Sequence, residues 1–358
     1  MHAMQYQAPP WLPGGHAQTI WPVLFAKRFV GPAPQFKRER WTTPDGDFVD
    51  VERLVETGSR LGVAAANDAQ GSGTPAPQVA ASAASAAAAE IGSERPLLVL
   101  FHGLEGGLDS QYIQAFAAVA AERGWAFAMP YFRGCSGELN LAPRAYHSGD
   151  FEEIGWMLSQ LRAAHRGPMI AAGVSLGGNA LLRWAQEAGE EAAKTVKAVC
   201  SVCSPLDLTA AGHAIGKGFN YLVYTRMFLN TMRPKALRKL KQHPGLFDGE
   251  RLRRARNLYE FDNIFTAPLH GFRDVDDYWL RASAKPHLAR IRVPALVLNA
   301  RNDPFVPAHS LPEQSHVGAF VTLWQPHEGG HVGFPAGRPP GHVLAMPDKV
   351  CQWLARAL

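Results

Sequence analysis

The sequence has few cysteines and no long apolar run. Its four cysteines, at positions 135, 200, 203 and 351, are too few and too scattered among 358 residues for the disulfide framework of a small secreted domain. No apolar stretch approaches the roughly eighteen residues of a membrane-spanning helix. The first residues lack the charged and then apolar pattern of a signal peptide. We therefore expect a cytoplasmic protein without a transmembrane anchor.

Signatures of metal and nucleic-acid binding are also missing. Cys200 and Cys203 have the spacing of a redox or half-zinc motif, but they fall in the apolar run 196–203 and no second Cys or His pair completes a site. We interpret them as core cysteines and expect no metal and no organic cofactor. The net charge of +5 is modest, and no zinc-finger spacing, basic heptad helix or RNA-binding aromatic signature accompanies it. Nucleic acid is therefore not an expected partner.

The composition is that of a folded globular chain, with 47% apolar and 19% charged residues. Residues 1–40 are rich in Pro, Gly and aromatic side chains, which predicts an extended N-terminal arm rather than a regular element. Residues 56–95 shift to Ala, Ser, Gly and Pro, a low-complexity excursion without expected chemistry. The remaining residues of 41–205, together with 291–358, are expected to form one folded core.

Short apolar runs alternate with amphipathic segments along this core. A turn at 42–47 predicts a β-hairpin before them. The runs predicted as buried strands are 97–101, 125–130, 169–174, 196–203, 295–299 and 319–324. The segments predicted as helices are 112–123, 150–165 and 179–189. This alternation implies right-handed crossovers, and so an α/β fold with a mainly parallel central sheet flanked by helices.

One segment, 206–290, interrupts that alternation. It has no convincing core strand and holds fifteen Lys or Arg against eight Asp or Glu. We interpret it as a mostly helical insertion that lies over the carboxyl ends of the strands as a lid. Its basic excess either orients an anionic substrate or lipid surface, or forms an ordinary solvated helical face, which is the favoured interpretation.

The most informative motif is Gly173-Val174-Ser175-Leu176-Gly177. It follows a predicted strand and precedes a predicted helix, which is the context that the nucleophile elbow G-x-S-x-G requires. A sharp turn there places the serine in strained backbone geometry, and the glycines let neighbouring backbone approach closely. Ser175 is therefore the candidate nucleophile, and a serine at this position indicates acyl transfer.

A serine nucleophile needs a base, and the base needs an acid that orients it. In this fold the chain order is serine, acid, histidine. Asp303 follows the strand 295–299, and His331 lies in a Gly-rich loop after the last strand, so we predict these two as acid and base. Asp207, after the preceding strand, is the rival acid, and His327 is the rival base.

The oxyanion that forms during acyl transfer needs backbone N–H donors. The fold supplies one from the residue after the nucleophile and one from the loop after an earlier strand. Those residues are Leu176 and Leu104. His102, at the start of the same loop, is interpreted as a structural residue.

Four landmarks make the chain resemble the YheT-like hydrolases, the bacterial branch of the family that includes the ABHD1 and ABHD3 type proteins of eukaryotes. The landmarks span nearly the whole sequence. They are residues 10–19 (Pro-Trp-Leu-Pro-Gly-Gly-His-Ala-Gln-Thr), 102–106 with Ser110, Tyr112 and Ile113, 133–140, and 173–179. The N-terminal landmark is the most specific, because the others occur in many α/β-hydrolases.

The resemblance implies a catalytic triad of Ser175, Asp303 and His331, and carboxylesterase activity. It places no catalytic role on His16, whose segment we interpret as packing. Some membrane-anchored relatives act on phospholipids, but this sequence has no such N-terminal anchor, and the Ala-rich stretch lies outside the family pattern. We expect hydrolysis of short or medium-chain carboxylic esters; a phospholipid or thioester hydrolase, an acyltransferase and a silent ligand-binding scaffold are the alternatives.

Overall fold

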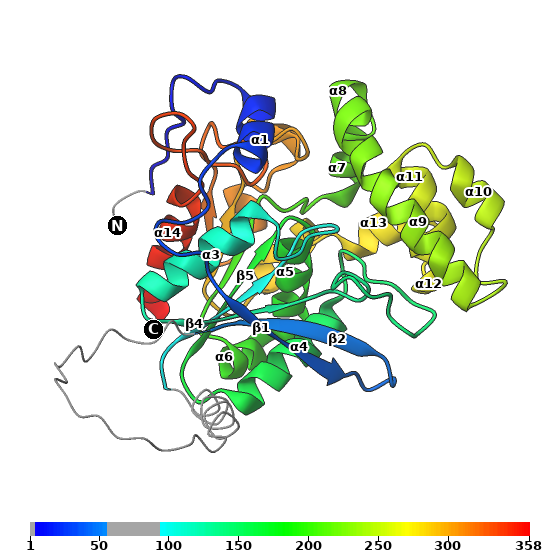
Figure 1. Cartoon of the computed structure of the whole chain (residues 1–358), viewed down its shortest axis with the longest axis horizontal. Helices are drawn as coiled ribbons and strands as arrows, with labels where there is room; N and C mark the ends of the chain where they lie inside the picture. The colour runs from blue at the N-terminus through cyan, green and yellow to red at the C-terminus, as the bar shows by residue number, and fades with distance from the viewer. Residues whose placement is uncertain (1–3, 56–93) are drawn as a thin grey trace, which may run out of the picture.

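Eight strands form one sheet in the computed structural model, which describes residues 4–55 and 94–358 (Figure 1). Their order across the sheet is β1-β2-β4-β3-β5-β6-β7-β8. The strands are β1 Phe36–Thr42, β2 Phe48–Leu54, β3 Leu97–Phe101, β4 Ala126–Pro130, β5 Met169–Val174, β6 Val199–Val202, β7 Ala295–Leu298 and β8 Val321–Trp324. The hairpin β1–β2 and the pair β2–β4 are antiparallel, and all other neighbours are parallel. This topology confirms the predicted α/β class.

Helices cover both faces of the sheet. One layer contains α3 (Gln111–Glu122) and α14 (Ala345–Leu354), and the other contains α4 (Phe151–Ala164), α5 (Leu176–Ala188) and α6 (Ala192–Thr195). Each layer encloses its own apolar core against the sheet. The strands of the sheet are therefore held between two packed layers of helices.

Strand β3 shows why the core strands have unbroken apolar sequences. Leu97, Val99 and Phe101 face one core, whereas Leu98 and Leu100 face the other. All five are at most 1% exposed. A parallel strand covered on both faces buries every side chain, so an alternating polar pattern would leave polar groups in the core.

The N-terminal region differs from the extended arm expected from its sequence. Residues Gly15–Leu24 form the helix α1, and β1 begins at Phe36, inside the expected arm. Helix α1 has no side-chain cap at Gly14 and contains Pro22, so local propensity does not favour it. Tertiary contacts stabilise it instead, because Gln18, Thr19 and Pro22 are buried against the rest of the chain. The Ala-rich excursion predicted at 56–95 lies, up to residue 93, outside the described residues.

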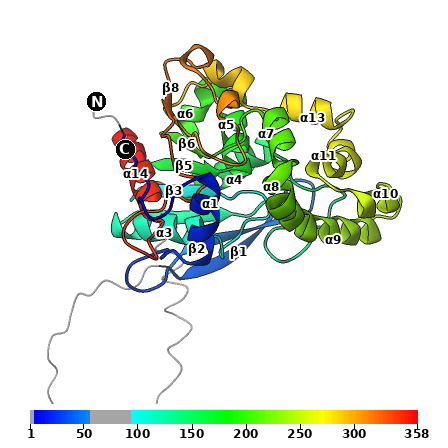
Figure 2. The same ribbon diagram turned by 90° about the horizontal axis from the view of Figure 1, so that it is seen from above.

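We refer to residues 206–290, between β6 and β7, as the cap. Its α-helices are α7 Leu208–Ile215, α8 Gly218–Asn220, α9 Arg226–Gln242, α10 Gly249–Arg254, α11 Leu258–Phe261, α12 Ala267–Leu269 and α13 Val275–Ala282. Two π-helical turns, Tyr221–Thr225 and Asp262–Thr266, interrupt them. Figures 1 and 2 both show the cap at one end of the molecule, with α1 between it and the layer that contains α14.

Candidate active site

Ser175 lies in the turn between β5 and α5, as the elbow motif predicts. Its backbone has φ 53° and ψ −119°, a left-handed conformation that costs a serine about 1–3 kcal/mol. Its N–H donates a hydrogen bond to the carbonyl oxygen of Val202 at 2.8 Å. This hydrogen bond to the end of β6 therefore stabilises the strained turn. The serine side chain lies at the end of β5 rather than within the core.

Two glycines allow the elbow to form. A Cβ added at Gly177 would overlap the carbonyl oxygen of His102, and one added at Gly178 would overlap the hydroxyl of Ser204. The first obstacle is backbone and cannot rotate away. Close approach between α5 and the loop after β3 therefore requires glycine at position 177, which is the steric cause of the second glycine of the motif.

His331 lies within hydrogen-bond distance of both other residues predicted as a triad. His331 Nε2 is 3.1 Å from Ser175 Oγ, and His331 Nδ1 is 2.8 Å from Asp303 Oδ2. With its hydrogen on Nδ1, the imidazole donates to the carboxylate and accepts from the serine hydroxyl. Asp303 has a fully buried side chain whose other oxygen accepts from the N–H groups of Phe305 and Val306 at 2.8 and 3.3 Å.

The rival residues lie elsewhere. Asp207 caps helix α7, where its carboxylate accepts a hydrogen bond from the N–H of Ala210 at 3.0 Å. His327 is exposed. The ring of Phe305 stacks on His331 with centroids 4.0 Å apart. The imidazole is therefore held by stacking on its face and by hydrogen bonds at its two nitrogens.

The loop after β3 is held by two tyrosines. The N–H of Gly103 donates to Tyr112 Oη at 2.9 Å, and the N–H of Glu105 donates to Tyr146 Oη at 3.0 Å. Leu104 lies between these two anchored residues and lines the same cavity as Ser175 and Leu176. The predicted oxyanion donors are therefore brought to the nucleophile, although their role stays a prediction.

His102, at the start of this loop, is engaged on both ring nitrogens. Its Nε2 accepts from the N–H of Phe132 at 3.1 Å, so its Nδ1 carries the hydrogen and donates to the oxygen of Gly103 at 2.7 Å. Burial lowers the pKa of His102 to about 4. A neutral imidazole that ties two backbone segments together agrees with a structural role.

The nucleophile opens into a cavity between the core and the cap. The empty space, including the solvent at its mouth, is about 1140 Å³. Most of its lining is apolar, including Leu208, Ile215, Phe228, Met232, Leu258, Phe265, Trp279 and Phe305. Burial in this wall raises the pKa of Asp262 to about 6 and lowers that of His147 to about 4. The wall around these two residues thus disfavours their charged forms.

Most basic side chains of the cap are exposed, which agrees with a solvated helical face, but two lysines of α9 line the cavity. Lys235 Nζ lies 2.6 Å from Glu105 Oε1, beside the predicted oxyanion residue. Lys239 Nζ donates to the carbonyl oxygens of Asn140 and Ala142 at 2.5 and 2.9 Å. Burial lowers the pKa of Lys239 to about 8. These two lysines, one helical turn apart, therefore attach α9 to the core.

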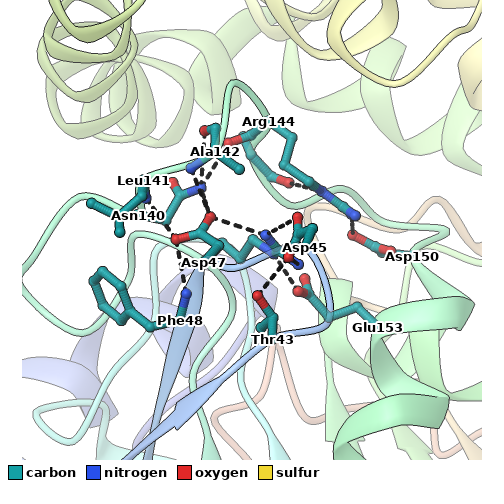
Figure 3. A network of polar contacts seen from close by, with 12 residues as sticks. Thr43, Asp45, Asp47, Phe48, Asn140, Leu141, Ala142, Arg144, Asp150 and Glu153 are labelled. Carbon is teal, nitrogen blue, oxygen red and sulfur yellow. Dashed lines mark hydrogen bonds and ion pairs between the residues drawn. The ribbon is translucent and has the colours of Figure 1, made fainter.

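The second attachment rests on a buried polar network (Figure 3). Asp47 Oδ2 accepts from Asn140 Nδ2 at 2.7 Å and from Arg133 Nη1 at 2.9 Å, and Arg133 also pairs with Glu153 and Asp45. The landmark 133–140 thus holds the loop on which Lys239 docks.

Sequence reasoning missed several residues that hold the site. Asn179, the last residue of the elbow landmark, is fully buried; its amide donates to the carbonyl oxygens of Ser148 and Ala282, both at 2.8 Å, and accepts from the N–H of Ala284 at 3.0 Å. It ties the elbow helix to the end of the cap. The only sequence signal for it is a polar side chain directly after a glycine-rich turn.

The profile of the α/β hydrolase fold matches residues 96–335. Escherichia coli YheT, which is named as a candidate esterase, is 35% identical over 346 residues, 96% of this chain and 91% of its own. The chain belongs to the α/β-hydrolase family. The likeness to YheT confirms the resemblance drawn from the sequence landmarks.

Other relatives carry lipid-related names. Mouse phospholipase ABHD3 is 30% identical over 74% of this chain, and the match spans 64% of the mouse protein. Yeast monoacylglycerol lipase is 26% identical over 73% of this chain and 59% of its own length. These relatives of the chain thus carry esterase or lipase names.

Solved structures share the fold. A hydrolase from Agrobacterium vitis S4 matches with a TM-score of 0.51 and 17% identity, over 89% of this chain and 99% of its own. Mouse α/β hydrolase domain-containing protein 10 matches with a TM-score of 0.50 and 13% identity, over 90% of this chain and all of its own. At this identity the likeness supports the fold alone.

The described residues add two findings. Cys200 and Cys203 are fully buried in the apolar core, as expected for core cysteines. None of the helices in residues 4–55 and 94–358 combines the length and apolar character that crossing a bilayer requires.

Proposed function

We propose that this protein is a serine hydrolase that cleaves carboxylic esters through an acyl-enzyme on Ser175. The observation that carries the proposal is the hydrogen-bonded row from Ser175 through His331 to Asp303, which opens into a mostly apolar cavity. An activated hydroxyl, an oriented base and an apolar binding space are the parts that ester hydrolysis needs.

In the first step Ser175 Oγ attacks the acyl carbonyl carbon while His331 Nε2 takes the hydroxyl proton. The N–H groups of Leu104 and Leu176 stabilise the oxyanion. His331 then gives its proton to the alcohol oxygen as the C–O bond breaks. Water repeats the sequence on the acyl-enzyme, which releases the acid and restores the serine. Asp303 stays ionised and orients the imidazole; this mechanism needs no metal or organic cofactor.

We propose short or medium-chain esters as substrates, with residues 206–290 acting as a lid over the core made by 41–205 and 291–358. The apolar lining of the cavity suits an acyl chain. It also suits the longer chains of a lipid ester, and relatives named phospholipase and monoacylglycerol lipase make this the main alternative. A cytoplasmic location and the lack of a nucleic-acid partner stay predictions from the sequence.

A panel of esters and thioesters of graded acyl length, assayed on wild type and Ser175→Ala, tests the proposal. Wild type should turn over esters, with a maximum at one chain length, and Ser175→Ala should not. A parallel series with an added acceptor alcohol separates hydrolysis from acyl transfer, because a transferase forms the new ester in preference to the acid. Absence of turnover across the panel would instead favour a binding scaffold.

A further inference from the structure

Helix α1 and the residues before it pack onto the loops that carry Asp303 and His331. These loops follow β7 and β8, about 300 residues away along the chain. Figure 2 shows α1 beside the cap rather than at the outer edge of the sheet. The N-terminal landmark of the sequence therefore lies next to the candidate active site.

Gln18 joins the two loops through its side-chain amide. It is fully buried, and its Oε1 accepts from the N–H of Gly329 and from Asn302 Nδ2, both at 2.9 Å. Asn302 in turn accepts from the N–H of Gly330 at 3.0 Å through its Oδ1. The orientation of the Gln18 amide is fixed, because its Nε2 donates to the carbonyl oxygen of Leu12 at 2.9 Å. One buried side chain thus sets the spacing between the acid loop and the histidine loop.

Thr19 holds the main chain of the histidine itself. Its hydroxyl accepts from the N–H of His331 at 2.8 Å and donates to the oxygen of Gly15 at 2.7 Å. Because the hydroxyl hydrogen is already engaged with Gly15, the lone pair that faces His331 has a defined direction.

The backbones of the helix and the loops also touch. A Cβ at Gly15 would overlap the carbonyl oxygen of Asn302, and one at Gly333 would overlap that of Gln18. Contact with the acid loop therefore requires glycine at position 15, and contact with α1 requires glycine at position 333. The surfaces fit closely enough that a shift of α1 must move both loops.

We propose that Gln18 and Thr19 are positioning residues that hold Asp303 and His331 in reacting geometry. The inference rests on the proposed triad. The hydrogen bonds of these two side chains end on the acid and histidine loops, so their loss displaces the imidazole before it disturbs the sheet. A displacement of about 1 Å at a reacting group can cost roughly 100-fold in rate.

The test uses three variants of α1 and one matched control. Thr19→Val is isosteric and removes the hydroxyl, Thr19→Ser restores it, and Gln18→Met removes the amide. Gln186→Met is the control, because Gln186 is also a buried helical glutamine, 2% exposed, and its Nε2 donates to the oxygen of Ala284 at 2.8 Å, away from the triad loops. Steady-state kinetics, thermal unfolding and the downfield proton resonance of His331 Nδ1–H are measured on each.

We expect Thr19→Val and Gln18→Met to lower kcat about 10- to 100-fold, with KM within about twofold, and to shift or broaden the His331 resonance. Thr19→Ser should recover most of the rate, and Gln186→Met should lose stability without this loss of kcat. If Gln18→Met does not fold, the Thr19→Val and Thr19→Ser pair decides.

An unchanged His331 resonance in Thr19→Val, or a kcat loss no larger than that of Gln186→Met, would overturn the inference. Failure of the proposed function is distinguishable from this result. In that case wild type shows no Ser175-dependent turnover, while the His331 resonance still reports whether α1 positions the imidazole.

Discussion

The nucleophile elbow and the cap are built in opposite ways. At the elbow, α5 meets neighbouring backbone so closely that Gly177 has no room for a Cβ, and β5 is completely buried. The cap instead consists of helices of 3–17 residues, two π-helical turns and separate small apolar clusters. We infer from this contrast that the elbow carries the proposed reaction, whereas the cap selects the acyl group.

The largest expected effect is at the acid. Asp303→Asn should lower kcat about 10⁴-fold, because an amide favours the wrong imidazole tautomer. Asp207→Asn is the matched control: asparagine caps a helix as well as aspartate does, so kcat and stability should stay near wild type. Steady-state kinetics of both variants decide between the two acids, and a larger loss in Asp207→Asn would reverse the assignment.

The next largest effect is the loss of stability when a glycine of the elbow, rather than one of the cap, is replaced by alanine. Gly177→Ala should destabilise the protein by about 3 kcal/mol or more, because its Cβ would press on backbone that cannot move aside. In the cap, Gly216 has φ −80° and its added Cβ would lie 3.4 Å from the oxygen of Gly212, so Gly216→Ala should stay within about 0.5 kcal/mol of wild type. Urea unfolding measures both; equal losses would remove the contrast.

A cap substitution should change selectivity instead. Met232 lines the cavity from α9, and Met232→Trp fills space that a long acyl chain would use. The ratio of kcat/KM for long over short esters should fall about 10- to 100-fold. Met227 is on the same helix but is 51% exposed and does not line the cavity, so Met227→Trp should leave the ratio unchanged. A fall in both variants would mean that the helix fold, and not the cavity, was altered.

The smallest effect concerns Asp262, whose pKa burial raises to about 6. The unfolded carboxyl titrates near its ordinary value of about 4, so the folded state loses stability as pH rises from about 4 to about 6 and keeps that penalty above it. Asp262→Asn should therefore stabilise the protein by roughly 1 kcal/mol more at pH 8 than at pH 5. The exposed Asp276→Asn serves as control in urea unfolding at both pH values, and a pH-independent difference for Asp262→Asn would contradict the assignment.

Local pattern was enough to predict the core. The residues of each buried strand and of the elbow are contiguous in the sequence. Helix α5 begins at Leu176 rather than Asn179, directly after the nucleophile, and ends at Ala188 rather than Gly189. The last strand begins at Val321 rather than at residue 319, and it ends at Trp324 as predicted. Such shifts are ordinary, since strand and helix ends depend on tertiary contacts.

The supports of the site could not be predicted in this way. Helix α1 has no capping side chain at its N-terminus and contains a proline. Its stabilising partners are far away in the sequence; Gly329, which binds Gln18, is 311 residues from it. The pair Glu105 and Lys235 is separated by 130 residues. No local signal reports such pairings, so the sequence predicts packing for the N-terminal landmark but not the loops on which it packs.

The central claim is that Ser175 becomes acylated during turnover. Treatment with a fluorophosphonate, followed by intact mass measurement and peptide mapping, tests it most directly. We expect one adduct per chain on Ser175, none in Ser175→Ala, and a much slower reaction in His331→Ala. Ester turnover that persists in Ser175→Ala, or an active enzyme that carries no adduct on Ser175, would contradict it.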